Sequence, residues 1–222
     1  MQKNTTRRLT TSAVMLALAT AIAAITTLVP FFSQAFGGSF TFGSMLPIVI
    51  VSYMYGIKWG LFTSGTYAVI QIVMDLMMGT SSVLIPLFLP TSEDYMGAVA
   101  AIAILFIDYI IAYTVLGLGG LFRKRIKSKP LALALGSAVA LSLRYLAHIV
   151  SGYIFYGAWA EWFFSQEQYA WIGETVLATF SGNGLALIYS IFYNGLYMIP
   201  EIILTAVLAV ILSRVPQVKI EG

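Results

Sequence analysis

The sequence contains no cysteine, one histidine and few charged residues, since Asp, Glu, Lys and Arg together make up only 9% of the chain. The absence of cysteine excludes disulfides and thiolate chemistry, and a lone histidine excludes a multi-histidine metal site. No G-x-x-x-x-G-K-[ST] motif is present, so we do not expect the chain to hydrolyse ATP by itself. We expect neither an enzyme nor a protein with a bound cofactor or metal.

Hydrophobic residues make up 59% of the 222 residues, and the mean hydropathy is +0.89, which excludes an ordinary soluble domain. The apolar runs are continuous rather than alternating, so they indicate helices instead of a membrane barrel. The basic start and first apolar run resemble a signal peptide, but the run is long enough to be a span. We predict an all-α integral membrane protein, one compact bundle over residues 1–222, with six transmembrane helices at about 9–29, 44–57, 59–78, 98–122, 131–157 and 184–213.

The positive charges predict the orientation of this bundle. Eleven of the twelve Lys and Arg residues fall on one side if both termini are cytoplasmic: Lys3, Arg7, Arg8, Lys58, five between Arg123 and Lys129, Arg214 and Lys219. The opposite connections, roughly 30–43, 79–97 and 158–183, carry none. This distribution follows the positive-inside rule. The cluster "RKRIKSK" could also be a lipid or nucleic-acid patch. We favour a topology signal and expect no nucleic-acid partner.

Five ionisable residues remain at or within the predicted spans: Asp75, Asp108, Arg144, His148 and Glu201. A charge at the centre of a membrane helix costs about 2.5–3.5 kcal/mol on insertion scales, so such groups normally face protein or a wet cavity. Asp75 lies near an outer helix end, where water could reach it. Glu201 follows Pro200, which breaks the local helix and frees backbone groups.

Arg144 and His148 are four residues apart and share one face of a helix, and Asp108 lies at a similar depth. Asp108 and Arg144 could form a buried ion pair with a purely structural role. The residues that follow His148 favour a ligand site instead. The stretch "SGYIFYGAW" contains aromatic rings, among them Tyr156, and the small residue Gly152. A carboxylate, an imidazole and ring faces suit a small, flat, polar and cationic ligand.

The first predicted helix carries small residues at intervals of four: Ala13, Ala17 and Ala21. Such a stripe lets another helix approach closely in lipid. It predicts either packing within this chain or a docking face for a second protein.

Nearly the whole chain resembles the substrate-binding S-components of energy-coupling-factor (ECF) vitamin importers, most closely the thiamine-specific ones. The resemblance lies in "RLTTSAVMLALA", "DYIIAYTVLGLGGLF", "RYLAHIVSGYIFYGAWA" and "YSIFYNGLYMIPE", which occur in family order. It implies that Ala13, Ala17 and Ala21 dock on a membrane-embedded coupling subunit. It also implies these substrate-binding residues: Asp108, Tyr109, His148, Gly152, Tyr156, Tyr189 and Asn194.

Two departures from the family pattern stand out. Asp108 occupies a position where the best-known members have glutamate, and Tyr156 occupies one that the family pattern can fill with a stacking tryptophan. A further ring from the first outer loop is expected over the ligand, for which Phe36 or Phe40 are candidates. Arg144 is expected to form the floor of the pocket or to pair with Asp108.

The resemblance implies a high-affinity thiamine-binding subunit in the prokaryotic cell membrane. Its outward-facing pocket would deliver the vitamin to a coupling subunit driven by two separate ATPases. Two alternatives stay open: an S-component for another vitamin or for the thiamine precursor hydroxymethylpyrimidine, and a stand-alone proton-coupled transporter that uses Asp108 and His148 as a relay.

Overall fold

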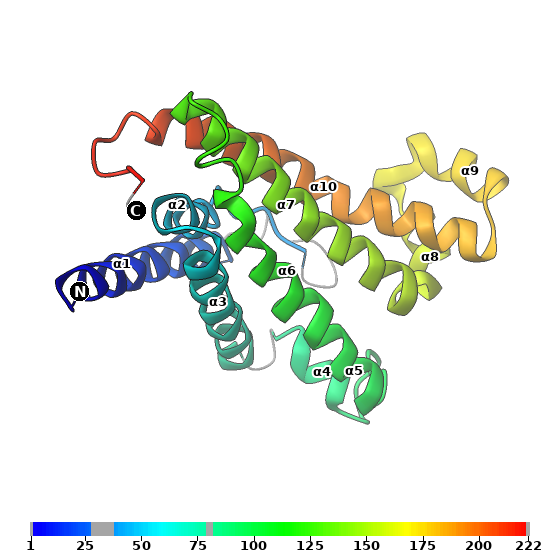
Figure 1. The fold of residues 1–222 in the computed structure, drawn as a ribbon. Helices are drawn as coiled ribbons and strands as arrows, with labels where there is room; N and C mark the ends of the chain where they lie inside the picture. The colour runs from blue at the N-terminus through cyan, green and yellow to red at the C-terminus, as the bar shows by residue number, and fades with distance from the viewer. Residues whose placement is uncertain (1, 28–37, 79–81, 221–222) are drawn as a thin grey trace.

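The structure is a computed structural model that describes residues 2–27, 38–78 and 82–220, and these residues form a helical bundle (Figure 1). The helices are α1 (Gln2–Thr27), α2 (Leu46–Tyr55), α3 (Ile57–Met77), α4 (Leu84–Phe88), α5 (Ala98–Ile104), the π-helical η4 (Leu105–Ile111), α6 (Ala112–Thr114), the 3₁₀ segment η5 (Val115–Gly120), α7 (Lys129–Phe155), the 3₁₀ segment η6 (Gly157–Trp159), α8 (Ala160–Phe164), the 3₁₀ segment η7 (Glu167–Tyr169), α9 (Ala170–Thr179) and α10 (Gly182–Leu212). The predicted all-helical class is therefore correct.

Five stretches in the described part of the chain are long and apolar enough to cross a membrane: Asn4–Thr26, Ile57–Met77, Ala98–Gly120, Lys129–Phe155 and Gly182–Leu212. The helix in the second predicted span, α2, has only 10 residues, all of them buried. At 1.5 Å per residue, such a helix covers about half of a 30 Å hydrocarbon core. The other helices enclose α2, which is too short to span the membrane by itself.

Helices also form where the sequence analysis expected none. The first helix begins at Gln2 instead of residue 9, because backbone hydrogen bonds continue through the polar "QKNTTRR" segment. The predicted outer connections contain α4, α8 and α9. Their short apolar turns pack onto the bundle, and Leu84, Leu87 and Phe163 are buried.

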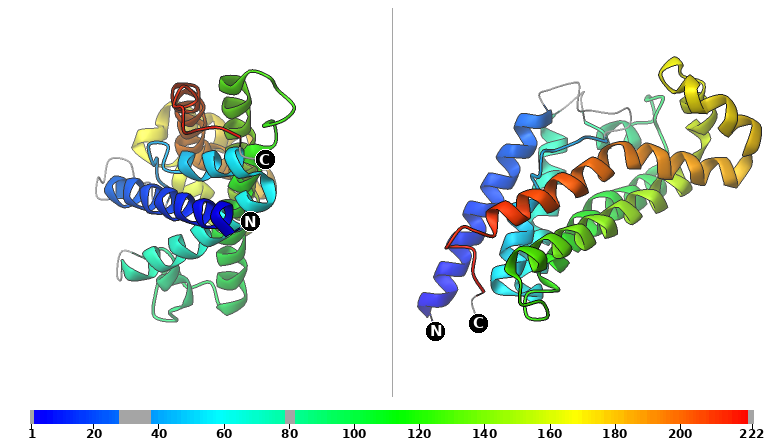
Figure 2. Two further views of the ribbon diagram at one scale, coloured as in Figure 1. Left: turned by 60° about the vertical axis from the view of Figure 1, so that its left-hand side comes forward. Right: turned by 90° about the horizontal axis from the view of Figure 1, so that it is seen from above.

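The bundle has two distinct ends. α7 and α10 lie side by side along most of their lengths, and the α8–α9 segment sits at one end of this pair (Figures 1 and 2). Both chain termini and the connection between η5 and α7 lie at the opposite end (Figure 2). The connection that carries the basic cluster Arg123–Lys129 thus lies at the same end of the molecule as both termini.

α1 packs through one face only. Its buried residues include Ser12, whose Oγ accepts a hydrogen bond of 2.8 Å from Trp59 Nε1, and Ala19, which is fully buried. Ala13, Ala17 and Ala21 lie on the exposed face. The alanine stripe therefore does not serve packing within the described part of this chain.

Glycines allow the helices at the basic end to approach closely. A Cβ atom on Gly136 of α7 would lie 2.0 Å from the carbonyl oxygen of Gly119, and one on Gly120 would lie 2.3 Å from that of Ser52. Ser52 Oγ links α2 to η5 by donating to the carbonyl oxygen of Gly117 and accepting from Gly120 N at 2.9 Å. Small residues at such contacts maximise backbone packing, which drives helix association in lipid.

We predict that Gly136→Ala lowers the thermal unfolding midpoint of the detergent-solubilised protein, because the new methyl group meets rigid backbone. Overpacking of this kind costs about 1–3 kcal/mol. Gly65→Ala is the matched control, since its Cβ would have only Thr114 Oγ1 within reach, at 3.9 Å. There, alanine is expected to be neutral or to stabilise helix α3 by about 0.5–1 kcal/mol. Equal midpoints for the two variants would contradict the close contact at Gly136.

Candidate functional site

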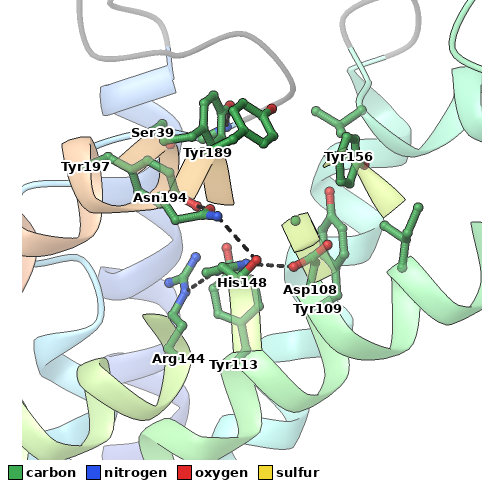
Figure 3. A pocket seen from close by; sticks show the side chains of 15 residues that line it. Ser39, Asp108, Tyr109, Tyr113, Arg144, His148, Tyr156, Tyr189, Asn194 and Tyr197 are labelled. Carbon is green, nitrogen blue, oxygen red and sulfur yellow. Dashed lines mark hydrogen bonds and ion pairs between the residues drawn. The ribbon is translucent and has the colours of Figure 1, made fainter. Parts of the chain in front are cut away.

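A cavity of about 120 Å³ lies between α7, α10 and the α5–α6 span (Figure 3). A single water molecule needs roughly 10–15 Å³ on the same measure, so the cavity has room for a small molecule. Polar and aromatic side chains dominate its wall. The lining residues are Gly38, Ser39, Val83, Ile104, Asp108, Tyr109, Tyr113, Arg144, His148, Gly152, Tyr156, Tyr189, Tyr193, Asn194 and Tyr197.

Asp108 is the acidic residue of this wall, and two residues of α7 hold its carboxylate. Oδ1 lies 2.7 Å from His148 Nδ1, and Oδ2 accepts a hydrogen bond of 2.5 Å from Ser151 Oγ. Asp108 belongs to η4, the π-helical part of its span. An inserted π turn shifts the register of the following side chains, and such turns are frequent at functional sites.

Arg144 fixes the hydrogen-bonding state of His148. Arg144 Nε donates to His148 Nε2 at 3.1 Å, so Nε2 must be an acceptor and the ring proton lies on Nδ1, where it is donated to Asp108. The guanidinium carbon lies 4.1 Å from the centre of the Tyr113 ring. Direct pairing with Asp108 was one of the two roles expected for Arg144, and the structure has a relay in its place, because His148 lies between the two side chains and bonds to both. Arg144 also lines the cavity, and its role as the floor of a ligand site stays a prediction.

Asn194 joins α10 to the same group. Its Nδ2 donates to the carbonyl oxygens of His148 at 3.2 Å and Ser190 at 2.9 Å, and its Oδ1 accepts from Tyr197 Oη at 2.6 Å. A Cβ on Gly152 would lie 2.2 Å from Ser190 Oγ. Gly152 therefore lets α7 and α10 approach closely at the cavity, in addition to lining it.

Tyrosines form the rest of the wall. Tyr189, Tyr193 and Tyr197 recur every four residues on α10 and form one aromatic strip, with neighbouring ring centres 5.7 and 6.2 Å apart. Tyr109 and Tyr113 show the same spacing on the opposite span, with ring centres 6.3 Å apart. Ring faces from two sides can enclose a flat or cationic ligand.

The segment before α2 closes part of the cavity and is anchored by a buried carboxylate. Glu201, which is 1% exposed, accepts hydrogen bonds from Thr41 N at 2.8 Å and from Gly43 N at 2.7 Å. Between them, Phe42 has a φ of 51°, a conformation that is unusual for a bulky residue. Two strong hydrogen bonds to a charged acceptor offset the strain of this turn.

Asp75 has a similar anchoring role instead of being solvated at its helix end. It is 9% exposed and accepts hydrogen bonds from Val83 N at 3.1 Å and Leu84 N at 3.0 Å, and also from Ser82 Oγ. Negative side chains stabilise helix N-termini. Asp75 thereby holds the start of α4 and the neighbouring Val83, which lines the cavity.

All seven predicted substrate-binding residues line this one cavity: Asp108, Tyr109, His148, Gly152, Tyr156, Tyr189 and Asn194. Their contact with a ligand stays a prediction. The sequence analysis missed Tyr113 and Tyr197 and did not select Tyr193. Tyr113 lies four residues after Tyr109, and Tyr193 and Tyr197 continue the same interval from Tyr189. This spacing puts them on the same helix faces and could have identified all three. Phe36 lies outside the described residues.

Phe40 does not line the cavity, contrary to the suggestion from the sequence, and its ring centre lies 4.7 Å from that of Phe42. No group of three His, Cys, Asp or Glu residues suitable for a metal ion occurs in the described part of the chain. The cavity wall presents a hydrogen-bonded carboxylate and aromatic ring faces.

The chain is similar in sequence and in structure to known proteins. The family described as "Thiamine transporter protein (Thia_YuaJ)" matches residues 13–220. The thiamine transporter ThiT of Bacillus subtilis (strain 168) is 29% identical over 208 residues, covering 89% of this chain and 87% of that protein. A solved structure of ThiT from Listeria monocytogenes has a TM-score of 0.57 at 17% identity, covering 94% of this chain and 98% of that chain. This structural likeness supports the fold.

We predict that Glu201→Gln lowers the thermal unfolding midpoint, because an amide cannot accept both backbone hydrogen bonds as strongly as a carboxylate. Hydrogen bonds to charged groups contribute about 1.5–3 kcal/mol each. Glu174→Gln, an exposed change of the same kind on α9, is the control and should leave the midpoint unchanged. An unchanged midpoint in Glu201→Gln would show that the carboxylate does not stabilise the turn at Phe42.

Proposed function

This chain belongs to the thiamine transporter protein family and is a multi-pass plasma membrane protein, and from this membership we propose that it binds thiamine in the cavity around Asp108. Family membership agrees with the resemblance recognised in the sequence. The observation that carries the proposal is the convergence of one carboxylate and several tyrosine rings on a single cavity (Figure 3). Thiamine combines a flat aminopyrimidine with a positively charged thiazolium ring, so it needs both features.

Each proposed contact follows from the geometry of the wall. The Asp108 carboxylate supplies a countercharge, and its bonds to His148 and Ser151 fix its direction. The rings of Tyr109, Tyr156 and Tyr189 offer faces for stacking and cation–π contact. His148 and Asn194 complete the polar side of the site, while Gly152 leaves room for the ligand near the helix contact.

We assign the cavity to the outer half of the membrane. The positive-inside rule puts the basic end of the bundle, with both termini, in the cytoplasm. In a six-span arrangement with α2 as the short second crossing, Gly38, Ser39 and Val83 belong to outer connections, and they line the cavity. We therefore propose one membrane domain over residues 1–222 with an outward-facing pocket.

Transport is proposed to require partners. The chain would act as the S-component of an ECF importer, in which a membrane coupling subunit and two separate ATPases supply the energy. The exposed face of α1, with Ala13, Ala17 and Ala21, supports docking on the coupling subunit, because small residues permit close helix contact in lipid.

A stand-alone proton-coupled transporter is the second candidate, because Asp108 and His148 share a hydrogen bond within a membrane span. Uptake that persists without any ATPase partner and stops on addition of an uncoupler would favour this candidate. Uptake that depends on the partners would favour the S-component.

We predict that Asp108→Asn weakens thiamine binding to the purified protein at least about tenfold, the equivalent of 1.4 kcal/mol, because the countercharge is lost. Isothermal titration calorimetry measures this directly. Hydroxymethylpyrimidine lacks the positive ring, so Asp108→Asn should reduce the affinity for this compound much less than the affinity for thiamine. Glu161→Gln, on an exposed turn of α8, is the control. Unchanged thiamine affinity in Asp108→Asn would remove the carboxylate from the proposed site, and tighter binding of hydroxymethylpyrimidine than thiamine would identify the precursor as the ligand.

We predict that Ala17→Trp leaves thiamine binding intact but abolishes uptake in cells that contain the coupling subunit and ATPases, because the indole prevents close docking. Leu18→Trp is the matched control, since Leu18 is 48% exposed and lies about 100° further around the same helix. Uptake of radiolabelled thiamine is the measurement. Full uptake with Ala17→Trp would contradict the docking role of the alanine face.

A further inference from the structure

Two connections that are distant in sequence meet at the basic end of the bundle. The first is the turn between α2 and α3, and the second is the segment between η5 and α7. Arg123 joins them by donating from Nε to the carbonyl oxygen of Tyr53 and from Nη2 to that of Met54, both at 2.8 Å. Its guanidinium is thus held against the end of α2 by two hydrogen bonds.

A concave surface of about 350 Å³ lies between these two connections, and we call it the basic notch. Four cationic side chains line it: Lys58, Arg123, Lys124 and Arg125. None of the described residues that line the notch is acidic. Like charges brought together repel one another, so this arrangement is more favourable when an anion lies among them.

The first turn of α3 adds a further positive contribution. Gly56 precedes this helix with a φ of 95°, no side chain caps it, and its first turn contains no acidic residue. The backbone N–H groups at a helix start favour an anion. Gly56 is suited to the position by space as well as by φ, because a Cβ there would lie 2.8 Å from Arg123 Nη1.

The remaining lining is apolar or aromatic and includes Tyr55, Ile57 and Leu121. A surface that combines cations with apolar groups at the end of a membrane helix suits a phosphate that is attached to a lipid. Phe62, which lies four residues after Lys58 and therefore close to the same face of α3, is 64% exposed. An acyl chain could therefore follow α3 while its headgroup occupies the notch.

We propose that the basic notch binds the phosphate of an anionic phospholipid headgroup. The positive-inside rule accounts for an excess of Lys and Arg on one side, but it does not require Lys58 to meet Lys124 and Arg125. Lys127 and Lys219 are exposed and lie outside the notch. They provide controls of equal charge within the same end of the molecule.

The test uses the purified full chain in detergent, with short-chain dioctanoyl phosphatidylglycerol as the probe and dioctanoyl phosphatidylcholine as the neutral comparison. Binding is measured by native mass spectrometry and calorimetry. We expect phosphatidylglycerol to bind at least about tenfold more tightly, since each surface cation contributes about 1 kcal/mol, or roughly fivefold, toward an anionic lipid.

The double variant Lys58→Gln/Lys124→Gln should lose about tenfold or more of this affinity, whereas Lys127→Gln/Lys219→Gln should retain it. Thermal midpoints establish that both variants are folded. Equal losses in the two variants would overturn the proposal in favour of a general charge effect. Equally tight binding of inorganic phosphate would assign the notch to a soluble anion, and the absence of a preference for phosphatidylglycerol would exclude the site.

Discussion

The hydrogen bond between Asp108 and His148 is the contact on which the geometry of the candidate site depends. A carboxylate in a membrane span is costly unless other groups satisfy it. His148 and Ser151 provide two partners, and Arg144 determines which ring nitrogen of His148 carries the proton. The carboxylate is therefore aimed by α7, although it belongs to a different span. A cation that entered the cavity, as proposed, would meet a charge that is already oriented and would not have to organise the site on binding.

The same requirement explains the other buried carboxylates. Glu201 and Asp75 accept hydrogen bonds from backbone N–H groups of segments that border the cavity, and these bonds offset the cost of burying the two carboxylates. Each ties residues outside the long helices to a long helix. The pocket wall consequently includes Ser39 and Val83, which lie outside the long helices. Polar groups that are expensive in lipid thus provide rigidity where helix packing alone cannot.

Much of the site could be predicted because chemistry and spacing coincide. Arg144 and His148 share a helix face, and polar residues within apolar spans are few enough to be paired by depth. Other features depend on contacts that the sequence pattern does not reveal. The relay through His148 requires the relative rotation of two helices, and the π-helical turn at Asp108 changes that rotation. α4, α8 and α9 were missed because apolar turns of five to ten residues resemble loops until a tertiary surface stabilises them.

Different contacts predominate at the two ends of the bundle, and this bears on whether the proposed ligand binding and the proposed docking can occur together. Near the cavity, Asn194 and the tyrosines connect α7 and α10 through directional hydrogen bonds and ring contacts. At the basic end, Gly120 and Gly136 allow the backbones of neighbouring helical segments to come into close contact. α1 contributes no residue to the cavity wall among the described residues, so the proposed docking through its exposed alanine face would leave the proposed ligand site unobstructed.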